Sequence, residues 1–462
     1  MLAWVTQLAR WYRSSSHRRV LSAAVIVGVF TFAARLAGAA KEILVAHHFG
    51  TSDEVDAFGL ALTLPAFAIS LVGGSLHLAF MPVYVDVRQR EGHAAAQRLL
   101  STATVLCVGL LAAAATLVAV AMPVLLPLFA SRFTPAKLEL TAHLSYLLLP
   151  CIVVAGTTTV WTAALYAHDD YARPSSAAVA VPLVSILSLL ALGRAWGIRA
   201  LAVGLLAGYC VEAALVGFAL VREGMSVLPR WRGLSEPVRR VLLQCAPMMA
   251  GTLVMGANPV IDSMMAARLQ PGSVAALGYG NKLVAFAMGI GSLSLGAAVF
   301  PLFSRLASNG DWVRMSRTIR LYALALLALT IPATLAVIGL SEPIARLLYE
   351  RGAFSRADTL LVARIQALYL VQIPFHITGN VFVRFLSATA GNSLLMWFSF
   401  VSCVVNVVGN VVLSRWLGAA GIALSTSLVY VVSFTLLGIA TWRRLHALSR
   451  PSEQREKLGI VA

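Results

Sequence analysis

The chain has 462 residues, of which 59% are hydrophobic and only 12% are charged, and its formal net charge is +17. A soluble domain would carry about twice this fraction of charged residues, so the composition excludes an ordinary soluble enzyme or binding domain. The basic excess is typical of the cytoplasmic loops of membrane proteins, and no nucleic-acid-binding motif accompanies it.

Apolar runs of about 20 residues recur along the whole chain, and this is the length that a helix needs to cross a bilayer. They predict an all-α polytopic membrane protein, because a β-barrel would show short segments of alternating polarity. The first 19 residues are basic and only partly apolar, so the first long run should act as its own insertion signal. The expected spans number twelve and lie at 20–47, 55–85, 97–128, 138–166, 175–193, 198–221, 238–267, 273–304, 314–340, 358–386, 393–413 and 418–442.

The first span contains three charged residues, with Arg35 about halfway along it and Lys41 and Glu42 nearer its outer end. A charge at the centre of a bilayer costs a few kcal/mol, so such a residue is expected to face a cavity or a partner. Positions 35 and 42 share a helix face, which predicts that Arg35 and Glu42 line one cavity wall. The alternatives are an ion pair of Arg35 with Glu42 or Asp56, and snorkelling of Lys41 to the outer interface.

Other charged residues near the spans are candidates for the same site. Asp56 opens the second span, where an acid could bind substrate or cap the helix N-terminus. In the second half of the chain, Lys282 is the best cationic candidate, and Asp262 could bind substrate or neutralise a cation. Glu212 is alone in the sixth span and could equally be a protonated acid shielded from lipid.

The remaining reactive side chains do not indicate a metal, cofactor or catalytic site. The five cysteines lie in or beside apolar runs without a CxxC pair, so buried thiols are expected. His47 and His48 lack the spacing that would complete a metal site. No nucleotide-binding or catalytic motif accompanies them, which favours a transporter driven by membrane potential, an ion gradient or consumption of its product.

The two halves of the chain repeat one another. A shift of 219 residues without a gap aligns spans one to six with spans seven to twelve, so both halves enter the membrane in the same direction. This predicts two six-helix lobes, 20–221 and 238–442, with the substrate site between them and a linker at 222–237. The matching pairs are Val55/Val274, Ala57/Ala276, Gly59/Gly278, Leu64/Leu283, Phe67/Phe286, Ser75/Ser294, Leu76/Leu295 and Pro82/Pro301.

The distribution of basic residues predicts the orientation. With the N-terminus inside, 22 Lys and Arg lie in or beside the inner segments and 9 in or beside the outer loops. This bias places both termini in the cytoplasm. The end segments 1–19 and 443–462 and the linker 222–237 are then cytoplasmic, and the expected location is a bacterial cytoplasmic membrane.

Four segments resemble the MurJ/MviN family of lipid II flippases, which belongs to the multidrug/oligosaccharidyl-lipid/polysaccharide exporter superfamily. The matches are spread from about residue 20 to 445, and their order is specific. They are Arg35-x-x-Gly38-x-x-Lys41-Glu42 with the following Ala46, Phe49-Gly50, Asp56-Ala57-Phe58 and Pro65, then ALGYGNKL at 276–283, LLYERGAFSRADT at 347–359 and VRFLSATAGNS at 383–393.

The resemblance implies two lobes around a cavity that opens alternately to each side of the membrane, and a substrate that is an undecaprenyl-diphosphate-linked saccharide. It implies that Arg35, Lys41 and Lys282 occupy positions where the family has cavity arginines. Glu42 and Asp56 fall on acidic positions of the same motif. Membrane lipids and the cell-envelope synthesis machinery are candidate partners.

The chain departs from the family at three places. The segment PAFAISLVGGSLHLAFMP at 65–82 lacks the arginine and glutamate that the family often has in span two. Lys41 and Lys282 replace arginines and so lose the planar fork that suits a diphosphate. Well-known members have fourteen spans, and this chain has twelve. A flippase for an exopolysaccharide or O-antigen unit, a cation-coupled drug antiporter and a non-transporting envelope-assembly scaffold therefore remain as alternatives.

Overall fold

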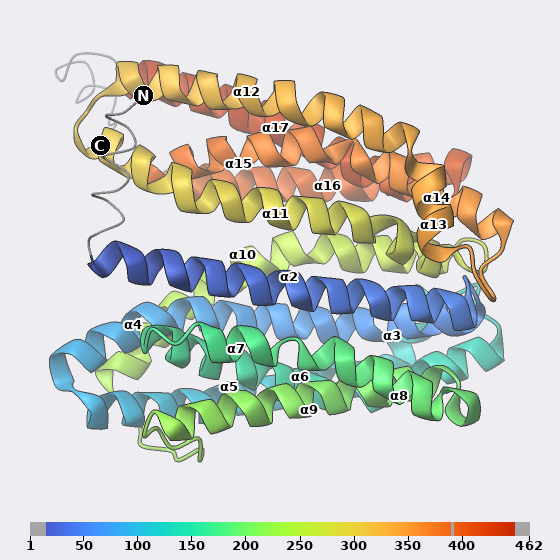
Figure 1. The fold of residues 1–462 in the computed structure, drawn as a ribbon, viewed down its shortest axis with the longest axis horizontal. Helices are drawn as coiled ribbons and strands as arrows, with labels where there is room; N and C mark the ends of the chain where they lie inside the picture. The colour runs from blue at the N-terminus through green and yellow to red at the C-terminus, as the bar shows by residue number, and fades with distance from the viewer. Residues whose placement is uncertain (1–14, 390–391, 449–462) are drawn as a thin grey trace. The chain divides into compact units, whose positions relative to one another are not determined.

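The computed structural model describes residues 15–389 and 392–448, and this part of the chain is helical without any strand (Figure 1). The predicted all-α fold is confirmed. The helices of the first half are α2 (Ser15–Phe49), α3 (Asp53–Ala68), the π-helix η1 (Ile69–Gly74), α4 (Ser75–Glu91), α5 (His93–Phe129), α6 (Pro135–Ala167), α7 (Ala172–Ala177), α8 (Ala180–Trp196) and α9 (Ile198–Arg222). Those of the second half are α10 (Glu236–Ala267), α11 (Ser273–Ser308), α12 (Trp312–Gly339), α13 (Ser341–Tyr349), α14 (Arg356–Leu370), α15 (Gln372–Ala388), α16 (Asn392–Leu417) and α17 (Ala419–Leu448).

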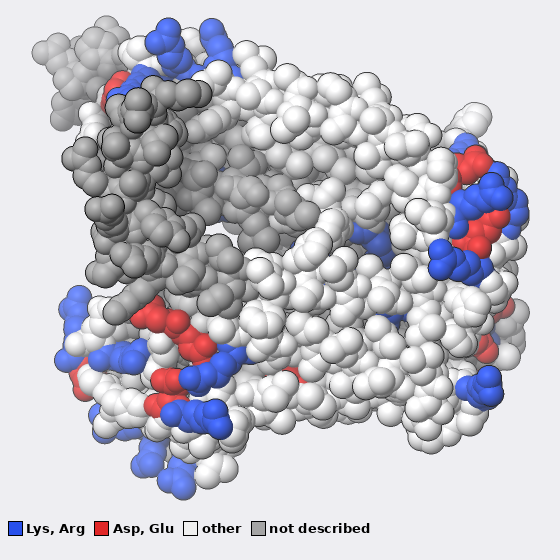
Figure 2. Space-filling view, in the orientation of Figure 1, with Lys and Arg blue, Asp and Glu red and all other residues white. Residues whose placement is uncertain are grey.

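The helices follow the predicted spans in order. Ten helical segments among the described residues are long and apolar enough to cross a membrane. Helices α2 and α11 have 35 and 36 residues and occupy the first and eighth predicted spans. On the face drawn in Figure 2, charged side chains gather toward the helix ends, and the middle of the surface carries few. This is the pattern expected where lipid surrounds the middle of each helix.

Contacts divide the chain into two compact units whose limits differ from the predicted linker at 222–237. Residues 45–60, from the end of α2 and the start of α3, belong to the second unit although they lie early in the sequence. The N-terminal half of α10 belongs to the first unit. Within the described residues, the first unit comprises the chain up to Leu44, Ala61–Leu128 and Pro135–Leu253, and the second comprises Val45–Leu60, Phe129–Thr134 and the chain from Val254.

The first unit is built around buried aliphatic and aromatic side chains of α4, α5, α6 and α9, including Phe80, Tyr84 and Leu111. Small residues let its helices approach closely, as is common between membrane helices. A Cβ atom on Gly208 of α9 would lie 2.8 Å from the Cα atom of Val181 in α8. A glycine is therefore required at this contact.

The second predicted span is interrupted by the six-residue π-helix η1. A Cβ atom on Gly73 in this turn would lie 3.0 Å from the Cα atom of Gly156 in α6. Such π-helical turns inside α-helices occur frequently at functional sites. Here the turn brings the backbone of span two against α6, where the first cavity described below is formed.

The second unit has its own core, formed by α11, α12, α15 and α17 around Phe303, Met315 and Phe385. Residues 45–60 add to this unit at the N-terminal ends of α11 and α14. The carbonyl of His47 accepts a hydrogen bond of 2.9 Å from the backbone N–H of Ala353. A Cβ atom on Gly50 would lie 2.6 Å from the carbonyl oxygen of Ala353, so the two loops pack backbone to backbone.

Candidate functional site

A cavity of about 570 Å³ lies within the first unit and contains Arg35. Thr31 and Arg35 are four positions apart, so helical spacing places both on one face of α2. The other walls come from α4, α6, the loop around α7 and α9. Many of the lining residues are polar or aromatic: His77, Thr158, Thr159, Thr162, Tyr166, Tyr209 and Glu212.

His77 is held in one orientation by α6. Its Nδ1 atom lies 2.8 Å from the carbonyl oxygen of Thr159, and a carbonyl can only accept, so Nδ1 carries a proton. The Thr159 hydroxyl oxygen lies 3.0 Å from the carbonyl oxygen of Gly73 and 2.7 Å from that of Gly156, and its one proton is shared between these two acceptors. The π-helical turn, α4 and α6 are thereby joined at the cavity wall, which keeps its polar groups in place.

The cavity combines one guanidinium, one carboxyl group and several hydroxyls. A guanidinium presents N–H donors in a planar fork that matches phosphate oxygens. Hydroxyls and the Glu212 carboxyl can exchange hydrogen bonds with sugar hydroxyls. The lining therefore suits a ligand that is anionic at one end and rich in hydroxyls at the other.

Lys41 and Glu42 form an ion pair with each other. Lys41 Nζ lies 2.9 Å from Glu42 Oε1, and both side chains are less than one-fifth exposed. Neither residue lines the cavity that contains Arg35. The expectation that Arg35 and Glu42 line one wall stays a prediction, and the contact given for Glu42 is its ion pair with Lys41. A contact of Lys41 with substrate stays a prediction.

A second cavity, of about 460 Å³, lies within the second unit around Asp262 of α10. Three neutral groups donate hydrogen bonds to the Asp262 carboxylate: Asn406 Nδ2 at 3.0 Å, Asn410 Nδ2 at 2.7 Å and Thr426 Oγ1 at 3.1 Å. The suggestion that Asp262 neutralises a cationic side chain is thus not supported in the described part of the chain. Tyr369 and Tyr430 complete the wall beside it.

Lys282 lies on α11 close to this second cavity. Its neighbour Asn281 lines the cavity, whereas Lys282 does not and is exposed. Successive residues of a helix point in different directions, so the two side chains leave α11 on different faces. The role of Lys282 in substrate binding stays a prediction.

Asp56 is buried and holds the N-terminus of α11. Its carboxylate accepts hydrogen bonds from the backbone N–H groups of Gly272, at 2.7 Å, and Ala275, at 2.8 Å. Only 1% of the residue is exposed, and it lines neither of the two cavities described above. Ala275 is the position that the 219-residue repeat pairs with Asp56. The capping role considered from sequence is present, but the capped helix is α11 rather than α3.

Replacement of Asp56 by alanine should destabilise the second unit. Two buried N–H groups would lose a charged acceptor, and such losses cost about 1–3 kcal/mol each. We expect a clear fall in the thermal unfolding temperature of the purified protein in detergent, and a smaller fall for Asp56→Asn. Glu54→Ala, an exposed acid in the same helical turn, is the matched control. Equal unfolding temperatures for Asp56→Ala and Glu54→Ala would contradict this role.

The sequence model described as "Lipid II flippase MurJ" matches residues 45–454, which is most of the chain. The chain belongs to the MurJ family. Two relatives named "Probable lipid II flippase MurJ" support this assignment. The one from Synechocystis is 27% identical over 94% of this chain and 84% of its own length, and the one from Rhizobium meliloti is 27% identical over 90% and 80%.

Solved structures show the same fold. "Lipid II flippase MurJ, inward closed conformation" superposes with a TM-score of 0.78 at 20% identity, covering 92% of this chain and 90% of that one. An inward-facing multidrug resistance transporter of the MATE family superposes with a TM-score of 0.75 at 14% identity, covering 93% and 99%. At these identities the likeness concerns the fold alone. It confirms the two-lobe helical architecture predicted for this MurJ-family chain.

Sequence reasoning missed most of the residues that surround Arg35 and Asp262 in this MurJ-family protein. Glu212 was singled out only as an isolated acid, although it shares the cavity with Arg35. One signal was available. Asn406 and Asn410 are polar residues one helical turn apart in an apolar span, which is a pattern that predicts a polar partner.

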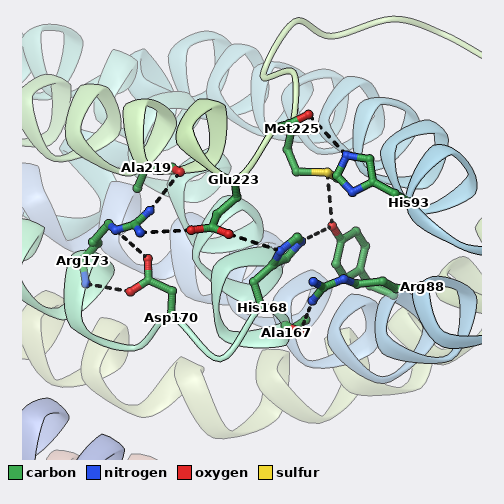
Figure 3. A network of polar contacts seen from close by, with 11 residues as sticks. Arg88, His93, Ala167, His168, Asp170, Arg173, Ala219, Glu223 and Met225 are labelled. Carbon is green, nitrogen blue, oxygen red and sulfur yellow. Dashed lines mark hydrogen bonds and ion pairs between the residues drawn. The ribbon is translucent and has the colours of Figure 1, made fainter.

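A further polar network joins helix ends of the first unit (Figure 3). His168 follows α6, and its Nε2 atom lies 3.0 Å from the hydroxyl oxygen of Tyr84. Arg88 donates to the carbonyl of Ala167 at 2.7 Å. Glu223 accepts from Arg173 Nη2 at 3.0 Å and lies 3.9 Å from His168 Nδ1. The network ties the ends of α4, α6 and α9 to α7.

This network predicts a loss of stability below about pH 6.5. Burial of the ring, with a contribution from Arg88, lowers the pKa of His168, and the nearby Glu223 carboxylate offsets this only in part. A lowered folded-state pKa favours the neutral imidazole, so stability is complete above the unfolded pKa of about 6.5 and falls as the pH drops below it. The unfolding temperature should fall less between pH 7.5 and 5.5 for His168→Gln than for the wild type. His446→Gln, at an exposed histidine, should behave like the wild type.

Proposed function

We propose that this protein is a flippase that moves an undecaprenyl-diphosphate-linked saccharide from the inner to the outer leaflet by alternating access, for cell-envelope synthesis. The observation that carries the proposal is the polar cavity around Arg35 inside a bundle of apolar helices. Membership of the family described as lipid II flippase, in a multi-pass protein of the bacterial inner membrane, supports it.

The cavity suits the headgroup of such a lipid. Arg35 would bind the diphosphate through charge-assisted hydrogen bonds, which are about twice as strong as neutral ones. Threonine and tyrosine hydroxyls and Glu212 would replace the water that hydrates the sugar. The prenyl chain would stay in the surrounding lipid, because a hydrocarbon chain cannot form hydrogen bonds with polar side chains and would leave them unsatisfied.

The contacts of residues 45–60 with α11 support alternating access. Asp56 caps α11, the Tyr279 hydroxyl donates to the carbonyl of Gly50 at 3.1 Å, and Thr51 hydrogen bonds to Asp358. These contacts lie within the second unit, at what would be the outer ends of its helices in the proposed orientation. Outward opening would have to break them, and each consists of only one or two hydrogen bonds that can form again.

Lipid II is the first candidate substrate, and a different lipid-linked glycan is the second. The second candidate is favoured by η1, where the stretch Ile69–Gly74 carries no charge. The test is flipping by the purified protein in proteoliposomes, measured as exposure of the saccharide to an impermeant enzyme. Lipid II should be moved faster than a diphosphate-linked exopolysaccharide unit.

The outcomes of this assay separate the alternatives. Preference for the other glycan would replace lipid II as the substrate and keep the mechanism. Movement of neither lipid, together with efflux of a cationic dye, would favour the drug antiporter. Movement of no substrate at all would favour the scaffold and overturn the proposal.

The proposed orientation places both termini and the linker 222–237 in the cytoplasm. It predicts that a cysteine at Ser52 or Ser355, in a background without the native cysteines, reacts with an impermeant thiol reagent in intact cells. A cysteine at Ser235 should react only after the cells are opened. Labelling of the Ser235→Cys protein from outside would reverse the orientation.

A further inference from the structure

A third cavity, of about 280 Å³, lies within the second unit where α11 ends, α12 begins and α17 ends. It is separate from the cavities around Arg35 and Asp262, with which it shares no lining residue. Its lining combines apolar residues with several polar side chains. The side chains that matter belong to Ser304, Ser308, Trp312, Thr389 and Arg444.

Two donor groups on this lining are buried without an acceptor in the described part of the chain. They are the indole N–H of Trp312 and the Nε–H of Arg444. Only 8% of Trp312 is exposed, although it lies at the very start of a helix. The Nη2 atom of Arg444 donates to the carbonyl of Thr389, which fixes the guanidinium at the cavity wall. A buried donor without a partner costs about 1–3 kcal/mol, so two beside one cavity point to a ligand that accepts hydrogen bonds.

The electrostatic surroundings specify the charge of that ligand. Among the described residues, no ion pair involves Arg444. Arg305 and Arg443 are exposed close by in the sequence on α11 and α17. The acid nearest in sequence to Trp312 is Asp311, which accepts a hydrogen bond of 3.0 Å from the backbone N–H of Arg314 and so caps α12. An anion is therefore favoured, and a cation is not.

The position of the cavity specifies the ligand further. Three long apolar helices end or begin around it, so it lies at the depth of the lipid headgroups. We propose that this cavity binds a phosphate group, with Arg444 and the Trp312 indole as its donors and Ser304 and Ser308 at its wall. The phosphate could belong to a phospholipid headgroup or be free in solution. The site is independent of the flippase function proposed above.

The test is ligand-induced stabilisation of the purified full-length protein in detergent. Phosphatidylglycerol is titrated against diacylglycerol, which lacks the phosphate, and inorganic phosphate against chloride at equal ionic strength. The test variants are Trp312→Phe, which removes the N–H and keeps an aromatic ring, and Arg444→Gln. The matched controls are Trp416→Phe, at a tryptophan that is 83% exposed, and Arg443→Gln, at the neighbouring exposed arginine. The shift is measured within each variant, so a less stable variant still reports on binding.

We expect phosphatidylglycerol to raise the unfolding temperature of the wild type in a saturable way and diacylglycerol not to do so. Trp312→Phe and Arg444→Gln should weaken the apparent affinity at least about fivefold, whereas the controls should match the wild type. An effect of phosphatidylglycerol alone identifies a lipid headgroup, and an equal effect of inorganic phosphate identifies a site for the free anion. No saturable shift, or the same shift in all the proteins, overturns the proposal.

Discussion

Replacing Arg35 with alanine is expected to abolish movement of the lipid-linked saccharide while the protein remains in the membrane at normal abundance. Arg35 is the only Lys or Arg side chain on the described lining of the first cavity. Each charge-assisted hydrogen bond lost is worth about 1.5–3 kcal/mol, which corresponds to a factor of roughly 10 to 100 in binding. A diphosphate that loses its cation would have to enter an apolar bundle uncompensated, so the flipping rate should fall to background.

The conservative variant separates charge from geometry. Arg35→Lys should retain part of the activity, because the charge survives and the bidentate fork does not. The measurement is flipping in proteoliposomes at matched protein content, with Arg132→Ala in an exposed loop as the control for loss of a positive charge. Normal flipping by Arg35→Ala would show that the substrate does not depend on this guanidinium, and the proposed role of the cavity would be wrong.

A disulfide between Thr51→Cys and Gln270→Cys is expected to form in this conformation and to stop transport until a reductant is added. A Cβ atom on Gly272 would lie 2.7 Å from the Thr51 carbonyl oxygen, so the loops 48–54 and 268–272 touch. Disulfides form where Cα atoms come within about 7 Å, and residues beside such a contact are within reach. A disulfide there would prevent the loops 48–54 and 268–272 from separating.

The experiment requires a background in which the five native cysteines are replaced, since Cys210 is exposed and could react. Gly272 itself is a poor position for a cysteine because its φ of +81° favours glycine. Ser52→Cys and Pro271→Cys complete the scan, and each single variant serves as its own control. Full cross-linking with an unchanged flipping rate would show that this contact need not open, and the alternating-access proposal would fail while Arg35 binding could stand.

The sequence by itself determined the membrane class, the order of the helices and the family. These properties are local, because about 20 consecutive apolar residues make a span whatever surrounds them. The internal repeat, in which matching residues lie 219 positions apart, is also visible in the sequence. The superposition with solved MurJ and MATE structures confirms the two-lobe fold. The cost of a charge in lipid singled out Arg35 before any contact was known, and the structure places it in a cavity.

Only the tertiary structure shows which groups the charged side chains of the spans contact. Lys41 pairs with Glu42, and Asp262 accepts hydrogen bonds from side chains on α16 and α17, more than 140 positions away in the sequence. Asp56 caps α11 across 219 positions, and Trp312 and Arg444 both line a cavity that no motif indicates. Hydropathy and spacing describe how a residue relates to its own helix, and contacts between distant helices depend on how their faces are rotated and packed. A single segment does not contain this rotation and packing, so only the folded structure shows which group each buried polar side chain contacts.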